Sequence, residues 1–452
     1  MAGASDKARF YLEQSVPELH ELERKKIFTK DEITSIAKKR SDFEHILNAR
    51  GSKPADYARY AEYEMNLESL RKKRVHRMGV KANVHTGQRR IFFILDRGTR
   101  KFHGDLGLWM QAIEYARKEK AHKKLARVFT SVLRMHPTKP ELWIYAARYS
   151  TDVQADITTA RSYMQRGLRF CKTSKLLWLE YVKLEMIYIA KIAARQKILG
   201  LDGSRPEKQA QSTTDESESD TIALPDVTAE DVDPGLESSL EEVAVQNLTS
   251  TPVLTGAIPI AIFDATTKQF PNNSALGKRF FDMFAEFDRA PCQAKILQHV
   301  LASLLKSAPT ALETRICEFQ QPLVGLEATS AAYPTALGQS LASVKASMQQ
   351  IPHLRAKLAT AALLTLVPLM RTEGLDVAIE KVMAASLRKF VAALQPQNQS
   401  STLEQSGDRL ADVVDLLLAQ GRREDARHLT AYGLKHWKSD RLLQASAAVG
   451  PL

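Results

Sequence analysis

Three tryptophans recur at an almost constant interval, and this recurrence limits the possible folds more than any other feature of the sequence. Trp109 and Trp143 are 34 residues apart, and Trp178 follows 35 residues later. Each of them stands in a similar stretch that is rich in aromatic and small side chains. A fixed period of this length is typical of an array of helical repeats, in which each unit packs against its neighbours.

Each repeat also has a second half that contains an alanine–arginine pair. In the aromatic half, Trp178, Tyr181 and Glu185 have the spacing of one helical face, so the large ring is expected to lie between helices. In the other half, the small alanine is expected to permit close approach of the helices. The residues predicted to pack the repeats are Tyr57, Tyr60, Glu64, Trp109, Ala126, Arg127, Trp143, Ala160, Arg161, Trp178, Tyr181 and Glu185.

Several helix starts can be predicted from capping residues. Thr29 with Glu32 three residues later fits a capping box, in which each residue bonds the backbone of the other. Thr138 with Glu141 fits the same pattern. Pro140 is suited to the first turn of a helix, where its missing N–H costs little.

The pattern W-x-x-Y-x-x-x-E, followed by a helix with an alanine–arginine pair, resembles the half-a-TPR (HAT) repeat, a family found in RNA-processing complexes. The resemblance implies an all-α, HAT/TPR-like superhelical solenoid, here preceded by an N-terminal helical segment. An ordinary helical bundle with the same tryptophans in its core is the alternative. In both cases these residues have a structural role and carry no chemistry.

The charge is distributed unevenly along the chain, whose net charge is +12. Residues 1–203 carry a net charge of +18, whereas residues 204–255 carry −10 and are rich in helix-breaking residues. A basic array favours an anionic environment, and the acidic stretch has the composition of a disordered linker. The predicted divisions are 1–50 (N-terminal helical segment), 51–200 (repeat array), 201–256 (acidic linker) and 257–452 (degenerate helical repeats).

A cluster of basic residues is predicted to lie in an insertion between the halves of the first repeat, at 51–100. The cluster could contact RNA phosphates, act as a nuclear import signal, or form the solvated end of a long helix. No aromatic residue interleaves it, so base stacking is not expected. Its members are Arg71, Lys72, Lys73, Arg74, Arg77 and Lys81.

Sequence signals of catalysis are missing. The chain has no Gly-rich phosphate loop, no H-x-x-x-H zinc motif and no C-x-x-C pair, and its three cysteines are far apart. We therefore expect no catalytic residue, metal site, cofactor or small-molecule substrate; a helical enzyme would need convergent acids and a metal or diphosphate site. No apolar run of 18 residues and no N-terminal apolar segment occurs, so neither a membrane span nor a secretory signal is expected.

The N-terminal region carries a more specific resemblance. Tyr11–Leu19, Ile27–Thr29, Glu32–Ile33 and Lys39–Glu44 resemble the N-terminal signature of the U3 small nucleolar RNA-associated protein 6 family, in which this segment runs directly into HAT repeats. The resemblance implies a nucleolar, and hence nuclear, scaffold of the small-subunit processome. It would belong to the UtpB subcomplex, beside β-propeller subunits, and act with U3 small nucleolar RNA and pre-rRNA.

In this role the protein would support early pre-rRNA cleavage and 18S rRNA maturation without being the nuclease. A HAT-repeat scaffold of a splicing or mRNA 3′-end processing complex is the alternative. The array is expected to bind a peptide or a propeller of a partner, with direct RNA contact secondary.

Overall fold

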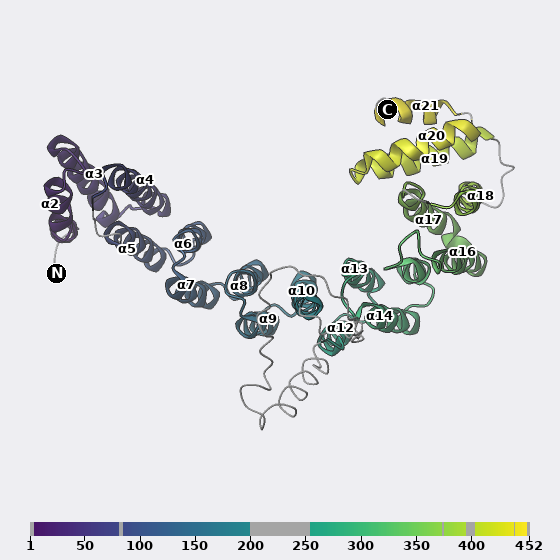
Figure 1. Ribbon diagram of the computed structural model, residues 1–452. Helices are drawn as coiled ribbons and strands as arrows, with labels where there is room; N and C mark the ends of the chain where they lie inside the picture. The colour runs from purple at the N-terminus through teal and green to yellow at the C-terminus, as the bar shows by residue number, and fades with distance from the viewer. Residues whose placement is uncertain are drawn as a thin grey trace, which may run out of the picture. The chain divides into compact units, whose positions relative to one another are not determined.

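The computed structural model describes residues 4–80, 85–198, 254–372, 375–394, 403–437 and 439–449. Within these ranges every regular element is a helix, so the all-α prediction is confirmed for them (Figure 1). None of these helices is long and apolar enough to cross a membrane. The predicted acidic linker lies outside the described residues up to residue 253. The chain divides into two compact units, Met1–Cys171 and Lys172–Leu452.

The amino-terminal unit consists of helices that pair in chain order. Helix α1 packs against α3, and α4, α6 and α8 each pack against the helix that follows (Figure 1). The helices are α1 (Ala4–Glu13), α2 (Val16–Arg24), α3 (Lys30–Asn48), α4 (Pro54–Met78), α5 (Thr86–Lys101), α6 (Leu106–Lys118), α7 (His122–Met135), α8 (Pro140–Asp152) and α9 (Ile157–Phe170).

Helix starts follow the capping residues in one case and depart from them in another. Thr29 and Glu32 form the predicted capping box of α3, with both reciprocal bonds present. The capping box predicted for Thr138 and Glu141 is wrong, because the N-cap of α8 is Lys139. A residue before proline is disfavoured in the helical region, and Lys139 has extended angles (φ −97°, ψ 100°). Helix α8 therefore begins at Pro140, the position predicted for this proline.

Glycine allows α5 to lie close to α4. A Cβ atom added to Gly98 of α5 would lie 3.0 to 3.1 Å from side-chain atoms of Tyr57 in α4. Tyr57 is buried, and its ring fills the space over this glycine. At the other end of α4, Gly79 has φ +65° and ends the helix in the left-handed conformation that glycine adopts without strain.

The second unit continues the pairing of successive helices. Helix α10 packs against α12 and α13. The helices are α10 (Lys175–Ile198), α12 (Ala257–Gln269), α13 (Ser274–Ala285), α14 (Gln293–Ser307), α15 (Leu312–Gln320), η2 (Gln321–Leu323), α16 (Tyr333–Gln350), η3 (Pro352–Leu354), α17 (Arg355–Met370), α18 (Val377–Ala393), α19 (Leu403–Ala419), α20 (Arg423–His436) and α21 (Asp440–Val449).

Aliphatic and aromatic residues form the interior of this unit. Phe263, Phe280 and Phe284 are fully buried where α12 meets α13. A single apolar cluster then extends from Ile316 in α15 to Val449 in α21. Most members of this cluster are leucine, valine and alanine, which accounts for the helical periodicity of a region that lacks the earlier tryptophan signature.

Candidate interaction surface

Most of the residues predicted to pack the repeats are buried between helices. Tyr60, Ala160 and Glu185 are completely buried, and Tyr57, Glu64, Trp109, Trp143 and Tyr181 are nearly so. Trp178 and Arg161 are half-buried. Their positions give them a packing role and leave little of their surface for a ligand.

The three tryptophans make the same hydrogen bond. Each indole N–H donates to the backbone carbonyl six residues earlier, in the turn that precedes its own helix, at 2.9, 2.9 and 3.2 Å. The bond fixes the turn against the ring, so each tryptophan both fills the core and closes the loop before its helix. The acceptor carbonyls belong to His103, Pro137 and Lys172.

Two of these carbonyls are also contacted from the far end of the same helix pair. His136 Nε2 lies 2.9 Å from the carbonyl oxygen of His103, and Cys171 Sγ lies 3.3 Å from that of Pro137. His136 and Cys171 are the C-cap residues of α7 and α9, and they stand 35 residues apart. Equivalent residues of successive repeats therefore reach back to equivalent carbonyls.

The packing role predicted for Ala126 and Arg127 is wrong. Both side chains are exposed, whereas Leu125 of the same helix is completely buried. The buried Leu125 of α7 corresponds to the buried Ala160 of α9, at a spacing of 35 residues and not the 34 that the alanine–arginine pairs suggest. A shift of one residue turns a helical side chain by about 100°, which is enough to move it from the core to solvent.

A buried ion pair joins α3 to α4. Arg40 donates from Nε and Nη2 to the two carboxylate oxygens of Glu64 at 2.7 and 2.8 Å, and its Nη1 lies 3.6 Å from Glu18. Arg40 is only 1% exposed. Burial alone would lower the pKa of Arg40, but the carboxylates of Glu64 and Glu18 raise it. The guanidinium therefore stays charged in the core of this unit.

Helix α5 is tied to the first three helices by further arginines. Arg90 donates to Glu18 of α2 at 3.0 Å, and Arg97 donates to Glu44 of α3 at 3.0 Å. The Arg97 guanidinium also lies 4.2 Å from the ring centroid of Tyr11 in α1, a cation–π contact. The N-terminal segment and the first helix pair thus form one ion-paired unit, which the sequence pattern did not predict.

A polar cavity of about 390 Å³ lies beside this network. Tyr60, Glu18 and Arg90 contribute to its lining. The Tyr60 hydroxyl and Arg40 Nη1 are buried and have no hydrogen-bond partner among the described residues.

The described members of the basic cluster lie in the last turns of α4, so the prediction of an insertion at this point is wrong. Arg71 is buried and donates from Nε and Nη2 to the two carboxylate oxygens of Glu68, at 2.6 and 2.7 Å. Lys72 pairs with Glu119 of the neighbouring α6–α7 turn at 3.0 Å. These two side chains therefore serve the packing of α4.

Arg74 is also held within the protein. It donates to both carboxylate oxygens of Glu32 at 2.7 and 2.8 Å, and its guanidinium lies 4.7 Å from the ring centroid of Phe28. Lys73 and Arg77 are exposed, whereas Lys81 lies outside the described residues. Of the described members, Lys73 and Arg77 are thus the best placed to contact phosphate.

The Arg74–Glu32 pair gives a pH-dependent contribution to stability. The hydrogen bonds from Arg74 and from the Thr29 backbone lower the pKa of Glu32 from 4.5 to about 2. The contribution is therefore fully present above about pH 4.5 and is lost as the pH falls toward 2. Because the pair is about one-third exposed, solvent screening limits its contribution to about 1 kcal/mol.

We expect Glu32→Gln to destabilise the amino-terminal unit by about this amount at pH 7, and the difference from the unsubstituted protein to shrink between pH 4.5 and 3. Urea unfolding of both proteins, followed by circular dichroism at pH 7, 4.5 and 3, measures the difference. Glu13→Gln, which removes an exposed carboxylate paired with Arg9, is the control. A difference that stays constant with pH would show that the Glu32 charge does not contribute.

The cysteines and histidines give no sign of a reactive or metal site in the described residues. No group of three or more potential metal ligands occurs among them. All three cysteines are buried, and burial raises the pKa of each thiol, that of Cys317 to about 12. A thiol with a raised pKa is a poor nucleophile at neutral pH.

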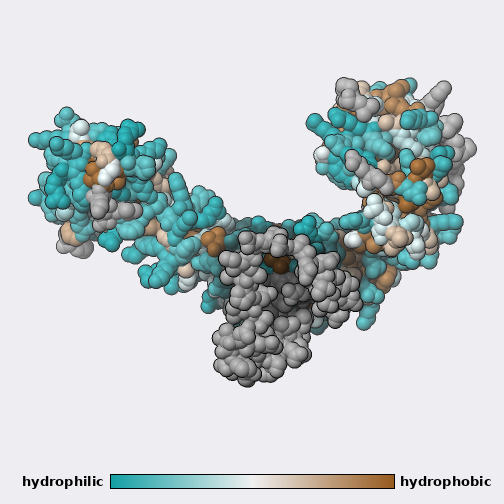
Figure 2. Space-filling model, viewed as in Figure 1, coloured by the Kyte–Doolittle hydropathy of each residue, from teal (hydrophilic) through white to brown (hydrophobic). Residues whose placement is uncertain are grey.

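The described surface is mainly hydrophilic on one face of the molecule (Figure 2). On the face that Figure 2 shows, hydrophilic residues cover most of the described surface, and hydrophobic residues form small, separate patches. Exposed apolar side chains such as Phe10, Val153 and Phe170 are scattered along the sequence. Single exposed apolar residues are normal for folded proteins and do not by themselves mark an interface.

Comparison with known proteins finds matches that share one description. Residues 12–93 match the family model described as U3 small nucleolar RNA-associated protein 6. The chain is 38% identical to the U3 small nucleolar RNA-associated protein 6 of Schizosaccharomyces pombe over 248 residues, which are 53% of this chain and 50% of that relative. These matches support the resemblance carried by the N-terminal signature.

Two further relatives carry the same description as homologs. The human protein is 31% identical over 40% of this chain and 31% of its own length. The Dictyostelium discoideum protein is 22% identical over 97% of this chain and 71% of its own length. The matched part of the chain thus spans half of the S. pombe relative and less than a third of the human relative, whereas the more distant match covers nearly the whole chain.

Proposed function

We propose that this protein is a non-catalytic scaffold in ribosome biogenesis that acts with the U3 small nucleolar RNA. The observation that supports this most is the match of residues 12–93 to the U3 small nucleolar RNA-associated protein 6 family. In the structure these residues include α2, α3 and α4, and the buried pair of Arg40 and Glu64 joins α3 to α4. The match therefore covers three complete helices and the contacts between them, which is stronger support than a short motif.

The architecture that fits this role is a HAT/TPR-like solenoid. Helix pairs that follow one another in contact, and tryptophans that make the same bond at a spacing of 34 and 35 residues, support a repeat array. The proposed divisions remain 1–50 for the N-terminal segment, 51–200 and 257–452 for the repeats, and 201–256 for the acidic linker. Such an array offers extended surfaces to protein partners and needs no cofactor.

Within ribosome biogenesis we place the protein in the nucleolus, in a UtpB-like subcomplex of the small-subunit processome. Its partners there would be β-propeller subunits, with U3 small nucleolar RNA and pre-rRNA in the same assembly, and its role would be to support 18S rRNA maturation. Direct RNA contact is secondary, since Arg71, Lys72 and Arg74 are engaged by carboxylates within the protein.

Affinity purification of the tagged protein from cell extract, with identification of the recovered proteins and RNAs, tests the proposal. We expect β-propeller proteins together with U3 RNA and 5′ pre-rRNA. Recovery of splicing or polyadenylation factors without those RNAs would favour a HAT scaffold of an mRNA-processing complex instead.

The same purification separates direct from indirect RNA contact. The double variant Lys73→Glu/Arg77→Glu reverses the two exposed charges of the basic cluster without touching its ion pairs. We expect the variant to retain the protein partners and most of the RNA, because protein contacts carry the assembly. The matched control is Lys118→Glu/Lys123→Glu, which reverses two charges at the α6–α7 turn. A selective loss of RNA in the first variant alone would assign a direct phosphate contact to the end of α4.

A further inference from the structure

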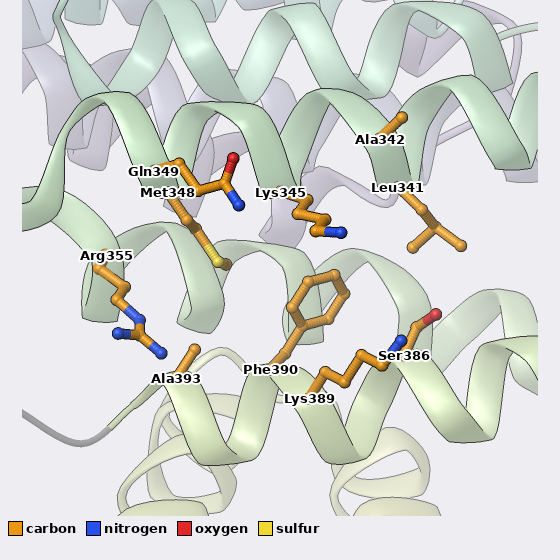
Figure 3. Close-up of a pocket in the computed structure, with 10 residues that line it drawn as sticks. All are labelled: Leu341, Ala342, Lys345, Met348, Gln349, Arg355, Ser386, Lys389, Phe390 and Ala393. Carbon is orange, nitrogen blue, oxygen red and sulfur yellow. The ribbon is translucent and has the colours of Figure 1, made fainter. Parts of the chain in front are cut away.

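A groove of about 620 Å³ lies between α16 and α18 in the second unit. Leu341 and Met348 of α16 and Phe390 of α18 line it with apolar surface (Figure 3). Figure 3 shows their side chains directed into the space between the two helices. This volume is typical of sites that accept several side chains of a ligand.

Positive charges surround this apolar surface. Lys345 of α16, Lys389 of α18 and Arg355 at the start of α17 are lining residues, and none of the lining residues is acidic. Figure 3 shows Lys345 and Lys389 on opposite sides of the groove, with Arg355 toward one end. An approaching ligand therefore meets cations on both helices.

The local sequence contains little to neutralise these cations. Residues 328–372, which include the whole of α16 and α17, contain no Asp or Glu but four Lys or Arg. In α18 the nearest acid before Lys389 is Glu380, nine residues earlier, which places it about 13 Å away along the helix. Such a separation exceeds the Debye length at physiological ionic strength, so Glu380 compensates little of the Lys389 charge.

We propose that this groove binds an acidic peptide segment of a partner protein that carries one or more apolar anchor side chains. The apolar lining would bury the anchors, while Lys345, Lys389 and Arg355 would pair with carboxylates on either side of them. In peptide recognition, apolar contacts usually supply most of the affinity, and surrounding charges of opposite sign orient the peptide. The inference goes beyond the proposed role in ribosome biogenesis and is independent of it.

The surface is less suited to RNA. Binding of single-stranded RNA depends on exposed aromatic rings on which bases stack. Phe390 is the only aromatic side chain in the lining, and it is 6% exposed, so its ring forms part of the apolar base of the groove and has no free face. A peptide with carboxylates next to apolar side chains would pair with the cations and also cover the apolar lining. A sugar–phosphate chain would pair with the cations alone.

Selection of random 16-residue peptides displayed on phage against the full-length protein tests the proposal. We expect the selected peptides to be enriched in Asp and Glu next to Leu, Met or Phe. The most frequent peptide, synthesised with a fluorescent label, should bind less tightly by about tenfold or more to the double variant Lys345→Glu/Lys389→Glu, and its affinity should fall with salt. A peptide in which serine replaces the apolar anchor should bind more weakly as well.

The matched control is Lys357→Glu/Lys381→Glu, which makes the same charge change at exposed positions of α17 and α18 that do not line the groove. It should retain binding within about twofold, and circular dichroism checks that both variants are folded. Selected peptides without acidic residues, or equal binding by both variants, would overturn the proposal. So would a labelled 12-nucleotide oligouridine whose binding is lost in the first variant only, or self-association of the protein that this variant abolishes.

Discussion

Replacement of Arg40 by methionine is expected to destabilise the amino-terminal unit by about 3 to 5 kcal/mol, the cost of breaking a buried ion pair from one side. The substitution leaves Glu64 without its bidentate partner, and the side chain of Glu64 is 2% exposed. Glu18 keeps Arg90, so the main uncompensated charge is that of Glu64. Hydrogen–deuterium exchange of the full-length protein measures the effect: protected amides of α3 and α4 should exchange roughly a hundredfold or more faster.

Two further variants show whether the charge or the packing is responsible. Arg40→Met/Glu64→Leu removes both charges and should recover most of the loss, because an apolar pair of similar volume can replace a buried ion pair. Arg9→Met breaks an exposed pair with Glu13 and should cost less than about 0.5 kcal/mol. A loss below about 1 kcal/mol for Arg40→Met would show that water or neighbouring groups compensate Glu64, contrary to the burial described above.

Replacement of Trp143 by alanine is expected to cost about 3 to 5 kcal/mol in the same unit. The indole is 4% exposed and stacks on Phe170 with a centroid distance of 6.0 Å and an interplanar angle of 13°. The variant therefore loses buried area, the stacking contact and the hydrogen bond to the Pro137 carbonyl. Exchange of the protected amides of α8 and α9 in the full-length protein measures the loss.

Trp143→Phe separates the ring from its N–H group. It keeps most of the apolar contact and removes the donor to Pro137, so we expect a cost of about 1 to 2 kcal/mol. Trp178→Ala is the matched control, because this indole makes the same bond but is half-buried, and its loss should be clearly smaller. Equal costs for Trp143→Ala and Trp178→Ala would show that the shared bond, and not burial, determines the contribution of these tryptophans.

Local signals predicted several features of the structure correctly. The capping box of Thr29 and Glu32 depends on two residues three positions apart, and Pro140 sets its own backbone angle. Both effects act within one turn of helix, so the sequence contains them completely. The Thr138 prediction was wrong for an equally local reason, since it neglected the restriction that Pro140 places on Lys139.

The register of a helix was harder to predict. The pairs at Ala126 and Ala160 look alike in sequence, yet Ala126 is exposed and Ala160 is buried. In α7 the larger apolar side chains of Leu125, Val128 and Phe129 determine which face turns inward, and the alanine follows from them. Aligning α7 with α9 by the alanine–arginine pair shifted the alignment by one residue. Aligning the two helices by the spacing of their apolar residues would have placed Leu125 opposite Ala160.

The sequence pattern predicted a packing position for Glu64 but not the buried arginine that pairs with it. The last turns of α4 look like a solvated basic stretch, but Glu68 and Arg71 are buried in contact with each other. Arg40 and Glu64 are 24 residues apart on different helices, so their pairing depends on the tertiary structure. Charged residues are read as solvent-facing when only hydrophobic periodicity is considered. For this reason an insertion was predicted where α4 continues.

The two contacts of the Pro137 carbonyl oxygen affect how this part of the chain resists stretching. It accepts the indole N–H of Trp143 and is contacted by the thiol of Cys171, the cap of the α8–α9 hairpin. Tension along the chain that pulls α9 away from α8 therefore loads the turn before α8, and the His103 carbonyl transmits load in the same way through His136. Each carbonyl thus holds the end of a hairpin to the turn at its start, and we expect α6–α7 and α8–α9 each to resist stretching as one unit until this contact breaks.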